Sequence, residues 1–403
     1  MPQPPKVSKF VVLPLILVLL ILVSTTGYRY YTGTLVIRSA VDLLSPAIPK
    51  TVSKLSIAFV EDGDSASNRR VLRNTLAQLV KLGWFAEYSI PCSDQFKDCI
   101  ELWYWACNNL ESDYIKLEEA HIWSFEWDER NRQAFRDQLA KHTTHGKLHV
   151  DLIIGMGNIT GHVLSNGSLN IPIVILNSRN PEEAGYTQGD RFSNRSNVFV
   201  AINSSLSDQQ IRMFYNVTKF KTLGIIYRNT RAGRADAGLS SINRLASEYG
   251  FKVLPKELES GIPMNDAALV GIRDLVTKVD ALFIPELPGI NYQTISQLNT
   301  PILAQGIPTF SQQGVDLVEQ GLLTTYTYSD YSMIGLFYAS VISKILNGVS
   351  PDSIPQYYES DLEVYINSAT AKQIDFLIPP SIRRSANTIF SSIMDKSNAE
   401  VLP

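Results

Sequence analysis

Apolar and polar residues alternate along the chain in the pattern of short buried strands followed by amphipathic helices. An apolar, β-branched run at 54–60 precedes a turn-rich segment and a helical pattern at 68–82. The first block continues with expected strands at 115–125, 150–156 and 171–176 and an expected helix at 130–141. Strands that alternate with helices build parallel sheets covered on both faces, so the pattern predicts an α/β fold.

The alternation restarts after a short apolar run at 197–202, which indicates a second, similar lobe. Its expected strands lie at 222–227, 251–254, 281–285, 309–311 and 322–326, and its expected helices at 237–249 and 267–278. A helix at 332–346 and a strand at 362–366 follow, which makes three places where the chain crosses between lobes. The expected boundaries are lobe 1 at 54–200, lobe 2 at 203–326, a return to lobe 1 at 327–362, and a return to lobe 2 with a tail at 363–403.

The N-terminal region 1–30 has the layout of an export signal. Lys6 and Lys9 precede an apolar run at 10–23 that is shorter than a full bilayer crossing requires, and small residues follow it. Tyr28, Arg29 and Tyr30 are residues suited to a membrane interface, so two fates stay open: cleavage, or retention as a membrane tether. We expect a periplasmic or extracytoplasmic protein, which is either free or anchored to the inner membrane.

Composition narrows the function further. The 403 residues are 45% apolar with a net charge of −3, so a basic surface for nucleic acid is not expected. Cys92, Cys99 and Cys107 fit no zinc pattern, and we expect one local disulfide and a spare thiol. They fall in an expected insertion at 91–113. Its aromatic residues could form a local mini-core, a partner surface or a cleft wall, and we favour the mini-core.

A glycine-rich turn, GMGNITG at 155–161, follows an expected strand and opens an expected helix. It differs from a dinucleotide loop because no acidic residue closes a second strand about 20 residues later. We instead expect its amides, with Asn158 and Thr160, to bind a small polar or anionic group. The chain has no nucleophile elbow, P-loop or His-Glu-x-x-His motif, so neither an enzyme nor a cofactor or metal is expected.

Short motifs lie along the expected strands and the loops after them. They include IIGMGN at 153–158, NSRNP at 177–181, KTLGIIY at 221–227, GIPTFSQQGV at 306–315 and LEVYINSATAK at 362–372. In their order along the chain, these motifs resemble the ABC-transporter substrate-binding group whose better-known members bind aromatic amino acids. The resemblance covers roughly 54–390 outside the insertion.

The resemblance implies a two-lobe, periplasmic-binding-protein-like fold of the first type with three hinge crossings. It implies capture of a small ligand, an amino acid or small organic anion, between closing lobes for an ABC permease. The expected ligand-binding residues all lie on loops after strands or on a crossing: Glu61, Asn158, Thr160, Asn177, Asn229, Thr230, Glu286, Ser311, Gln312 and Tyr328.

The chain departs from the family pattern at two loops, which leaves the ligand class open. Arg228, Arg231 and Arg234 stand where members often carry small hydroxyl residues, and Glu286 begins a loop where many have Thr-Asp-Asn. An arginine in a dry cleft can hold a carboxylate or phosphate through two hydrogen bonds, although arginines in a polar loop also form solvated surfaces.

Two other functions remain open from the sequence. The first is a membrane-anchored module of the same fold that senses a ligand and signals to a membrane partner instead of a permease. The second is a nucleotide-dependent enzyme that uses the loop at Gly155.

Overall fold

The computed structural model describes residues 43–47, 53–144, 150–167, 169–188, 192–193, 195–203, 205–259, 262–328, 330–359 and 361–394. The apolar run at 10–23, our expected signal or tether, lies outside them. In the ranges just given, no helix combines the length and the apolar character that a membrane crossing needs. Both sheets described below belong to one compact unit, Leu44–Pro403.

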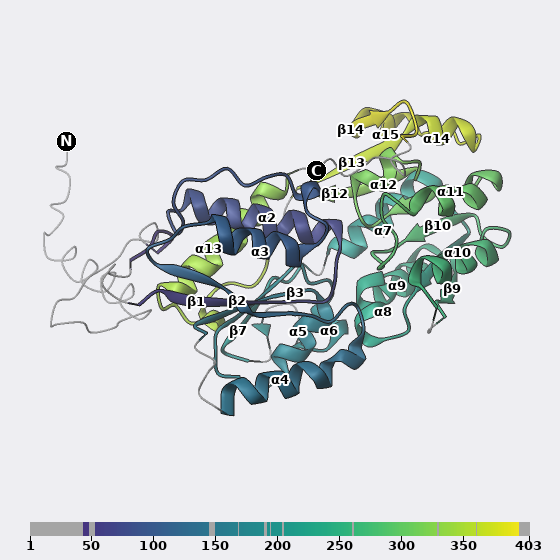
Figure 1. Ribbon diagram of the computed structural model, residues 1–403. Coiled ribbons are helices and arrows are strands. Elements are labelled where there is room, and N and C mark those ends of the chain that lie inside the picture. Colours follow the sequence, from purple (N-terminus) through teal and green to yellow (C-terminus); the bar gives the residue numbers. More distant parts are fainter. Residues whose placement is uncertain are drawn as a thin grey trace, which may run out of the picture. The chain divides into compact units, whose positions relative to one another are not determined.

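The first sheet consists of five parallel strands in the order β2-β1-β3-β4-β7 (Figure 1). Every residue of β3 and β4, two of the three inner strands, is buried, as expected for apolar runs covered on both faces. The apolar run that we expected only to connect the two blocks forms the edge strand β7. The strands are β1 (Leu55–Glu61), β2 (Ile115–Ser124), β3 (Leu152–Met156), β4 (Ile173–Leu176) and β7 (Val198–Val200).

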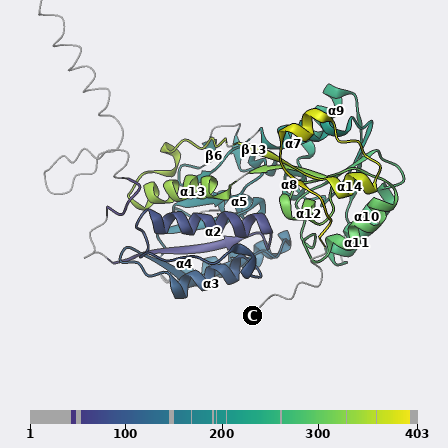
Figure 2. The ribbon, with the colours of Figure 1, turned by 90° about the horizontal axis from the view of Figure 1, so that it is seen from above.

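Helices cover both faces of this sheet. On one face α2, α3 and α13 share an apolar core with the strands, and α13 lies beside α2 although some 250 residues separate them (Figure 2). On the other face lie α4, α5 and α6. The bounds are α2 (Ala66–Lys81), α3 (Cys99–Asn109), α4 (Arg132–Thr144), α5 (Asn158–Ser165), α6 (Pro181–Ala184) and α13 (Tyr331–Leu346).

The second sheet has seven strands in the order β14-β13-β12-β11-β10-β8-β9. All neighbouring pairs are parallel except β12 and β13, because β13 enters the sheet after the chain has returned from the first lobe. The strands are β8 (Thr222–Tyr227), β9 (Lys252–Glu257), β10 (Ala281–Ile284), β11 (Thr309–Ser311), β12 (Thr324–Tyr328), β13 (Leu362–Asn367) and β14 (Ala386–Phe390).

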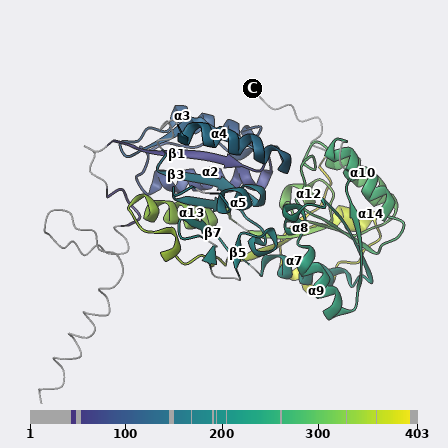
Figure 3. The ribbon, with the colours of Figure 1, turned by 90° about the horizontal axis from the view of Figure 1, so that it is seen from below.

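Helices α7 and α9 cover one face of the second sheet, and α10, α11 and α12 cover the other (Figure 3). The helices are α7 (Leu206–Thr218), α8 (Arg231–Ala237), α9 (Leu239–Tyr249), α10 (Met264–Leu275), α11 (Ile295–Ala304), α12 (Val315–Glu319), α14 (Ser368–Gln373) and α15 (Pro380–Ser385). Short elements complete the description: β5 (Thr187–Gln188), β6 (Phe192–Ser193), and 3-10 turns η1 (Ser93–Gln95), η2 (Glu129–Asn131) and η3 (Pro351–Ser353).

The helix expected at 237–249 is α9 in the structure, and α8, a short helix that we did not expect, lies directly before it. α8 ends and α9 begins at Gly238, whose φ of 67° lies in the left-handed region. A left-handed residue ends an α-helix, and glycine adopts that conformation without steric cost. The break turns α8 toward the first lobe, where it contacts α5 and α6.

The expected disulfide in the insertion is wrong: all three cysteines are free. Cys99 and Cys107 lie on one helix eight residues apart, which separates their Cα atoms by about 12 Å, beyond disulfide reach. Cys99 is fully buried with its thiol 3.9 Å from Met156 Sδ, whereas Cys92 is exposed. Trp103 and Trp105 of the insertion join the main core, and Trp103 stacks on Phe59 of β1 with ring centroids 4.8 Å apart, whereas Tyr104 is exposed.

Candidate functional site

The strand order of both sheets brings specific loops together. In each sheet two neighbouring strands, β1 and β3 or β8 and β10, lie where the winding of the chain changes direction. Loops at the carboxyl ends of such strands form the usual ligand crevice of open α/β sheets. In this chain, loops from these ends of both sheets bond to one another across the two lobes, and these contacts define the candidate site.

The centre of the site is an ion pair between the lobes. Arg179, in the loop after β4, donates from Nε and Nη2 to Glu286 Oε2 at 3.2 and 3.1 Å. Glu286, in the loop after β10, accepts a second hydrogen bond at Oε1 from the Ser67 hydroxyl, at 2.6 Å. The side chains of Arg179 and Glu286 are only 12% and 8% exposed, so the pair is largely removed from water.

A second set of contacts centres on Arg228, the first residue after β8. Its Nη1 donates to the backbone oxygen of Trp127 in the first lobe at 2.9 Å, and its guanidinium lies 5.1 Å from the centre of the Trp127 ring. Its Nη2 donates to Asp236 Oδ2 at 3.2 Å, while Asn158 Nδ2 of the first lobe reaches Asp236 Oδ1 at 2.7 Å. Burial raises the pKa of Asp236 to about 7, although the neighbouring Arg228 lowers it.

The glycine-rich turn carries an internal anion. Asp62, directly after β1, accepts hydrogen bonds from the amides of Ile159 and Thr160 at the start of α5, at 2.9 and 2.6 Å. Gly157 has a φ of 92°, and a Cβ there would lie 2.4 Å from the Asp62 carboxyl group. Burial raises the pKa of Asp62 to about 6, and the two amides oppose that rise. A side chain of the protein therefore occupies the amides that we expected to hold a ligand group.

Three buried donors of the site form no hydrogen bond among the described residues: Arg179 Nη1, Arg228 Nε and Gln312 Nε2. Gln312 is 2% exposed, its Oε1 accepts from the Glu286 amide at 2.9 Å, and its backbone oxygen lies 3.4 Å from Arg179 Nη2. Two of the unpaired donors, Arg179 Nη1 and Gln312 Nε2, therefore belong to residues that are in contact with each other. A buried unpaired donor costs free energy, so these donors favour a ligand that supplies acceptor atoms.

Several residues that we expected to bind ligand lie around this centre. Asn177 donates to Ser67 Oγ at 2.9 Å, which links it to the Glu286 carboxylate. Burial raises the pKa of Tyr328 to about 12, and the charge of Arg179, which is near enough to act on it, lowers that pKa. Asn177, Glu286, Gln312 and Tyr328 are thus brought together, and Asn158 joins the second set of contacts.

The other expected residues have local partners. Asn229 is exposed and bonds to Glu257, while Thr230 caps the start of α8 by accepting from the Gly233 amide at 3.0 Å. Ser311 is fully buried and donates to the Gly314 oxygen at 2.9 Å. Thr160 is also fully buried, and its amide holds Asp62.

Glu61 ends β1 beneath the site and is 2% exposed. Burial raises the pKa of its carboxyl to about 8, and the Ser124 side chain opposes this by hydrogen bonding.

Sequence reasoning missed three residues that make contacts between the lobes, Arg179, Ser67 and Asp236, and it missed Asp62, which fills the glycine-rich turn. Arg179 belongs to the NSRNP segment at 177–181 and Asp62 follows Glu61, so position after a strand could have flagged both. Ser67 and Asp236 lie within helices, and only the tertiary structure places them at the site. No group of three or more His, Cys, Asp and Glu residues in the described part of the chain is arranged to hold a metal ion.

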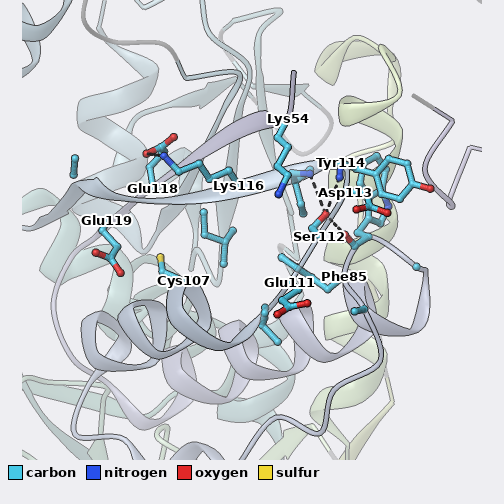
Figure 4. Close-up of a pocket in the computed structure, with 17 residues that line it drawn as sticks. Lys54, Phe85, Cys107, Glu111, Ser112, Asp113, Tyr114, Lys116, Glu118 and Glu119 are labelled. Atoms are coloured by element: carbon cyan, nitrogen blue, oxygen red, sulfur yellow. Dashed lines mark hydrogen bonds and ion pairs between the residues drawn. The ribbon is translucent and has the colours of Figure 1, made fainter. Parts of the chain in front are cut away.

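A large hollow lies elsewhere, with a volume of about 960 Å³, along the edge strand β2 (Figure 4). The loop at 83–86, the end of α3 and the first half of β2 line it. Ser112 beside it is fully engaged, accepting from the amides of Tyr114 and Ile115 and donating to the Trp84 oxygen. Its labelled rim residues include Lys54, Glu111 and Lys116, whose charges suit contact with solvent (Figure 4).

The sequence profile described as ABC transporter substrate binding protein matches residues 116–389. This chain belongs to that family. The family's proteins bind substrates and are not catalysts, and they are typically extracytoplasmic. No curated protein sequence matches the chain.

Solved structures show the same fold at low sequence identity. The ABC domain from Streptococcus pneumonia in complex with L-Trp is 17% identical, with a TM-score of 0.64, and covers 84% of this chain and 100% of its own. A conserved domain protein from Vibrio cholerae is 16% identical, with a TM-score of 0.61. A ligand-free, open substrate binding protein with adhesive properties from Clostridium difficile is 18% identical, with a TM-score of 0.51. Each covers 84% of this chain and 100% of its own. This ABC transporter substrate-binding protein therefore has the two-lobe periplasmic-binding-protein fold expected from its sequence.

Proposed function

We propose that this substrate-binding protein captures a small solute that carries a carboxylate, an amino acid or small organic anion, between its lobes and presents it to an ABC permease. The observation that carries the proposal is the group of unpaired buried donors at the contact between the lobes, Arg179 Nη1 and Gln312 Nε2 first among them. A carboxylate supplies several acceptor positions and one negative charge, which matches both an arginine and an amide donor.

Arg179 is the proposed anchor for the solute. It follows β4 of the first lobe and contacts two loops of the second lobe, so a solute bound to it touches both lobes when they close. Asn177, Gln312 and Tyr328 lie around it and supply polar groups for the remainder of the solute. Contacts from both lobes to the solute stabilise the closed state with solute bound, and the permease reads that state.

The proposed location is outside the cytoplasm, where a permease receives its solute. It is supported by the family, whose members are typically extracytoplasmic, and by the export-like pattern of the N-terminal sequence. The tether through residues 10–23 stays part of the proposal.

A thermal-shift screen of the purified full chain tests the function. The panel holds amino acids, small carboxylates, phosphorylated metabolites and nucleotides, together with a matched trio: L-tryptophan, indole-3-propionate, which lacks the amine, and tryptamine, which lacks the carboxylate. A solute at about 100 times its Kd adds about 2.7 kcal/mol to the free energy of unfolding.

We expect stabilisation by carboxylates and none by an amine such as tryptamine. Arg179→Gln should abolish the shift, while Arg212→Gln, which removes an arginine from an exposed ion pair of the second lobe, should preserve it. Stabilisation by nucleotides alone, or carboxylate binding that survives Arg179→Gln, would contradict the proposed function.

A further inference from the structure

The charged groups that join the lobes are already paired with one another. Arg179 of the first lobe holds Glu286 of the second, and Arg70 in α2 holds Asp316 in α12, also across the lobes. Two further hydrogen bonds cross between the lobes, from Asn158 to Asp236 and from Arg228 to the Trp127 oxygen. The closed arrangement thus has its own set of bonds, made entirely by the protein.

The geometry at Arg179 shows which part of the guanidinium is used. Nε and Nη2 both donate to Glu286 Oε2, and Nη1 forms no hydrogen bond with any described residue. The Nε and Nη2 edge is one of the edges that bind a carboxylate through two parallel hydrogen bonds. A solute carboxylate therefore meets an arginine whose paired edge is occupied by a carboxylate of the protein.

Glu286 is held firmly in this position. Its other oxygen accepts from Ser67 of the first lobe, and its backbone amide donates to the Gln312 side chain. Asn177 of the first lobe supports Ser67 by donating from Nδ2 to Ser67 Oγ at 2.9 Å. The same Nδ2 donates to Asn68 Oδ1 at 2.7 Å, which fixes the Asn177 side chain. The carboxylate is bound on both oxygens by the first lobe, as a bound ligand would be.

We propose that Glu286 is a built-in competitor for the solute carboxylate at Arg179, and that its ion pair with Arg179 holds the lobes closed before solute arrives. This gives Glu286 a different role from the direct ligand contact that its sequence position suggested. The competition rests on the proposed function, whereas closure without solute does not. Since solute binds only after Glu286 leaves, the apparent affinity is lowered by the fraction of chains in the competent state.

Amide hydrogen exchange of the full chain without solute tests the closure. In the wild-type chain, we expect slow exchange in loops 177–180, 285–288 and 312–314. Glu286→Gln keeps the size and an oxygen for Ser67 but loses the charge, and we expect exchange in these loops to rise about tenfold while the buried strands β3 and β4 stay unchanged. Ser67→Ala, which releases Oε1 only, should act in the same direction with a smaller effect.

Glu248→Gln is the matched control, because it removes the acidic partner of the exposed Arg212 pair in the same lobe. It should leave the cleft loops unchanged. Equal exchange of the cleft loops in the wild-type, Glu286→Gln and Ser67→Ala chains would overturn the proposed closure. This test requires no knowledge of the solute.

The competition is tested by the affinity for indole-3-propionate, a carboxylate without an amine. We expect Glu286→Gln to bind it about fivefold more tightly than wild type. Weaker binding by Glu286→Gln would show that Glu286 contacts the solute and would overturn the competition. If neither chain binds any carboxylate of the panel while the exchange result holds, the proposed function fails and the closure stands.

Discussion

Two ion pairs of this protein have the same chemistry in different surroundings. Arg179 and Glu286 are about nine-tenths buried, join two lobes, and share further bonds with Ser67 and Gln312. Arg212 and Glu248 are 35% and 45% exposed and join neighbouring helices of one lobe. An exposed pair contributes little to stability because water solvates both charges, whereas removal of one partner from a buried pair leaves a charge that must be hydrated. The proposed function therefore uses the buried pair and not the exposed one.

Gly157 and Gly348 have the same φ but different surroundings, so they allow a second comparison of a crowded site with an open one. Gly157→Ala places a Cβ 2.4 Å from the Asp62 carboxyl group, whereas Gly348, which also has a φ of 92°, has no atom within 4 Å of such a Cβ. We expect Gly348→Ala to lower the free energy of unfolding by about 1 kcal/mol, because alanine disfavours this backbone conformation. Gly157→Ala should cost about 3 kcal/mol, because Asp62 also loses its amides. Urea unfolding measures both, and equal losses would contradict the account of Asp62.

The pH dependence of stability extends the comparison of buried and exposed groups to Glu61, a buried carboxyl group that has no arginine partner among the described residues. Burial raises the pKa of Glu61 to about 8, so the folded chain holds a proton there that the unfolded chain releases above about pH 4. The free energy of unfolding should therefore fall as pH rises from 5 to 8. We expect Glu61→Gln to remove on the order of 2 kcal/mol of that fall in urea titrations, and Glu248→Gln to remove none. An unchanged slope in Glu61→Gln would contradict a raised pKa of Glu61 in the folded chain.

Removal of the arginines compares the two pairs directly. Arg179→Gln leaves Glu286 without its cation, and the lobes can separate to hydrate it, so we expect a loss of about 1–2 kcal/mol in the free energy of unfolding, less than for a pair locked in a core. Arg212→Gln should cost less than about 0.5 kcal/mol. Thermal unfolding of the three chains measures this, and equal losses would show that burial between the lobes adds nothing.

Salt gives the smallest expected effect. Exposed charges are screened over about 8 Å at physiological ionic strength, so the small contribution of the Arg212 pair should fade between 0.05 and about 0.5 M salt. The difference between wild type and Arg179→Gln should change less over that range, because the pair is shielded from ions. Differential stability measured at both salt concentrations tests this, and equal salt dependence of the two pairs would place the Arg179 pair in solvent.

The alternation of strands and helices was predictable because it depends on local periodicity. Strand β8 falls at the residues expected for it, 222–227, and buried runs such as β3 and β4 contain little besides apolar residues. Helix α9 was also expected, at 237–249, whereas α8 was missed because Arg231 and Arg234 gave its segment the character of a polar loop.

The site was harder to predict, because its bonds join residues far apart in the sequence. Position after a strand selected Glu286 and Gln312, which both bond to Arg179 of the facing lobe, and Asn177, which bonds to Ser67 beside them. The same rule also selected Asn229 and Thr230, whose partners are local. The charge partner of Glu286 is 107 residues away, and no local pattern encodes such a distance.

Isothermal titration of the full chain with the most stabilising carboxylate of the panel tests the central claim most directly. The account predicts one site for wild type and Arg212→Gln with equal affinity, and at least a hundredfold weaker binding by Arg179→Gln. Equal affinity of Arg179→Gln and wild type would contradict it, because the solute would then bind without the arginine on which the proposed site is built.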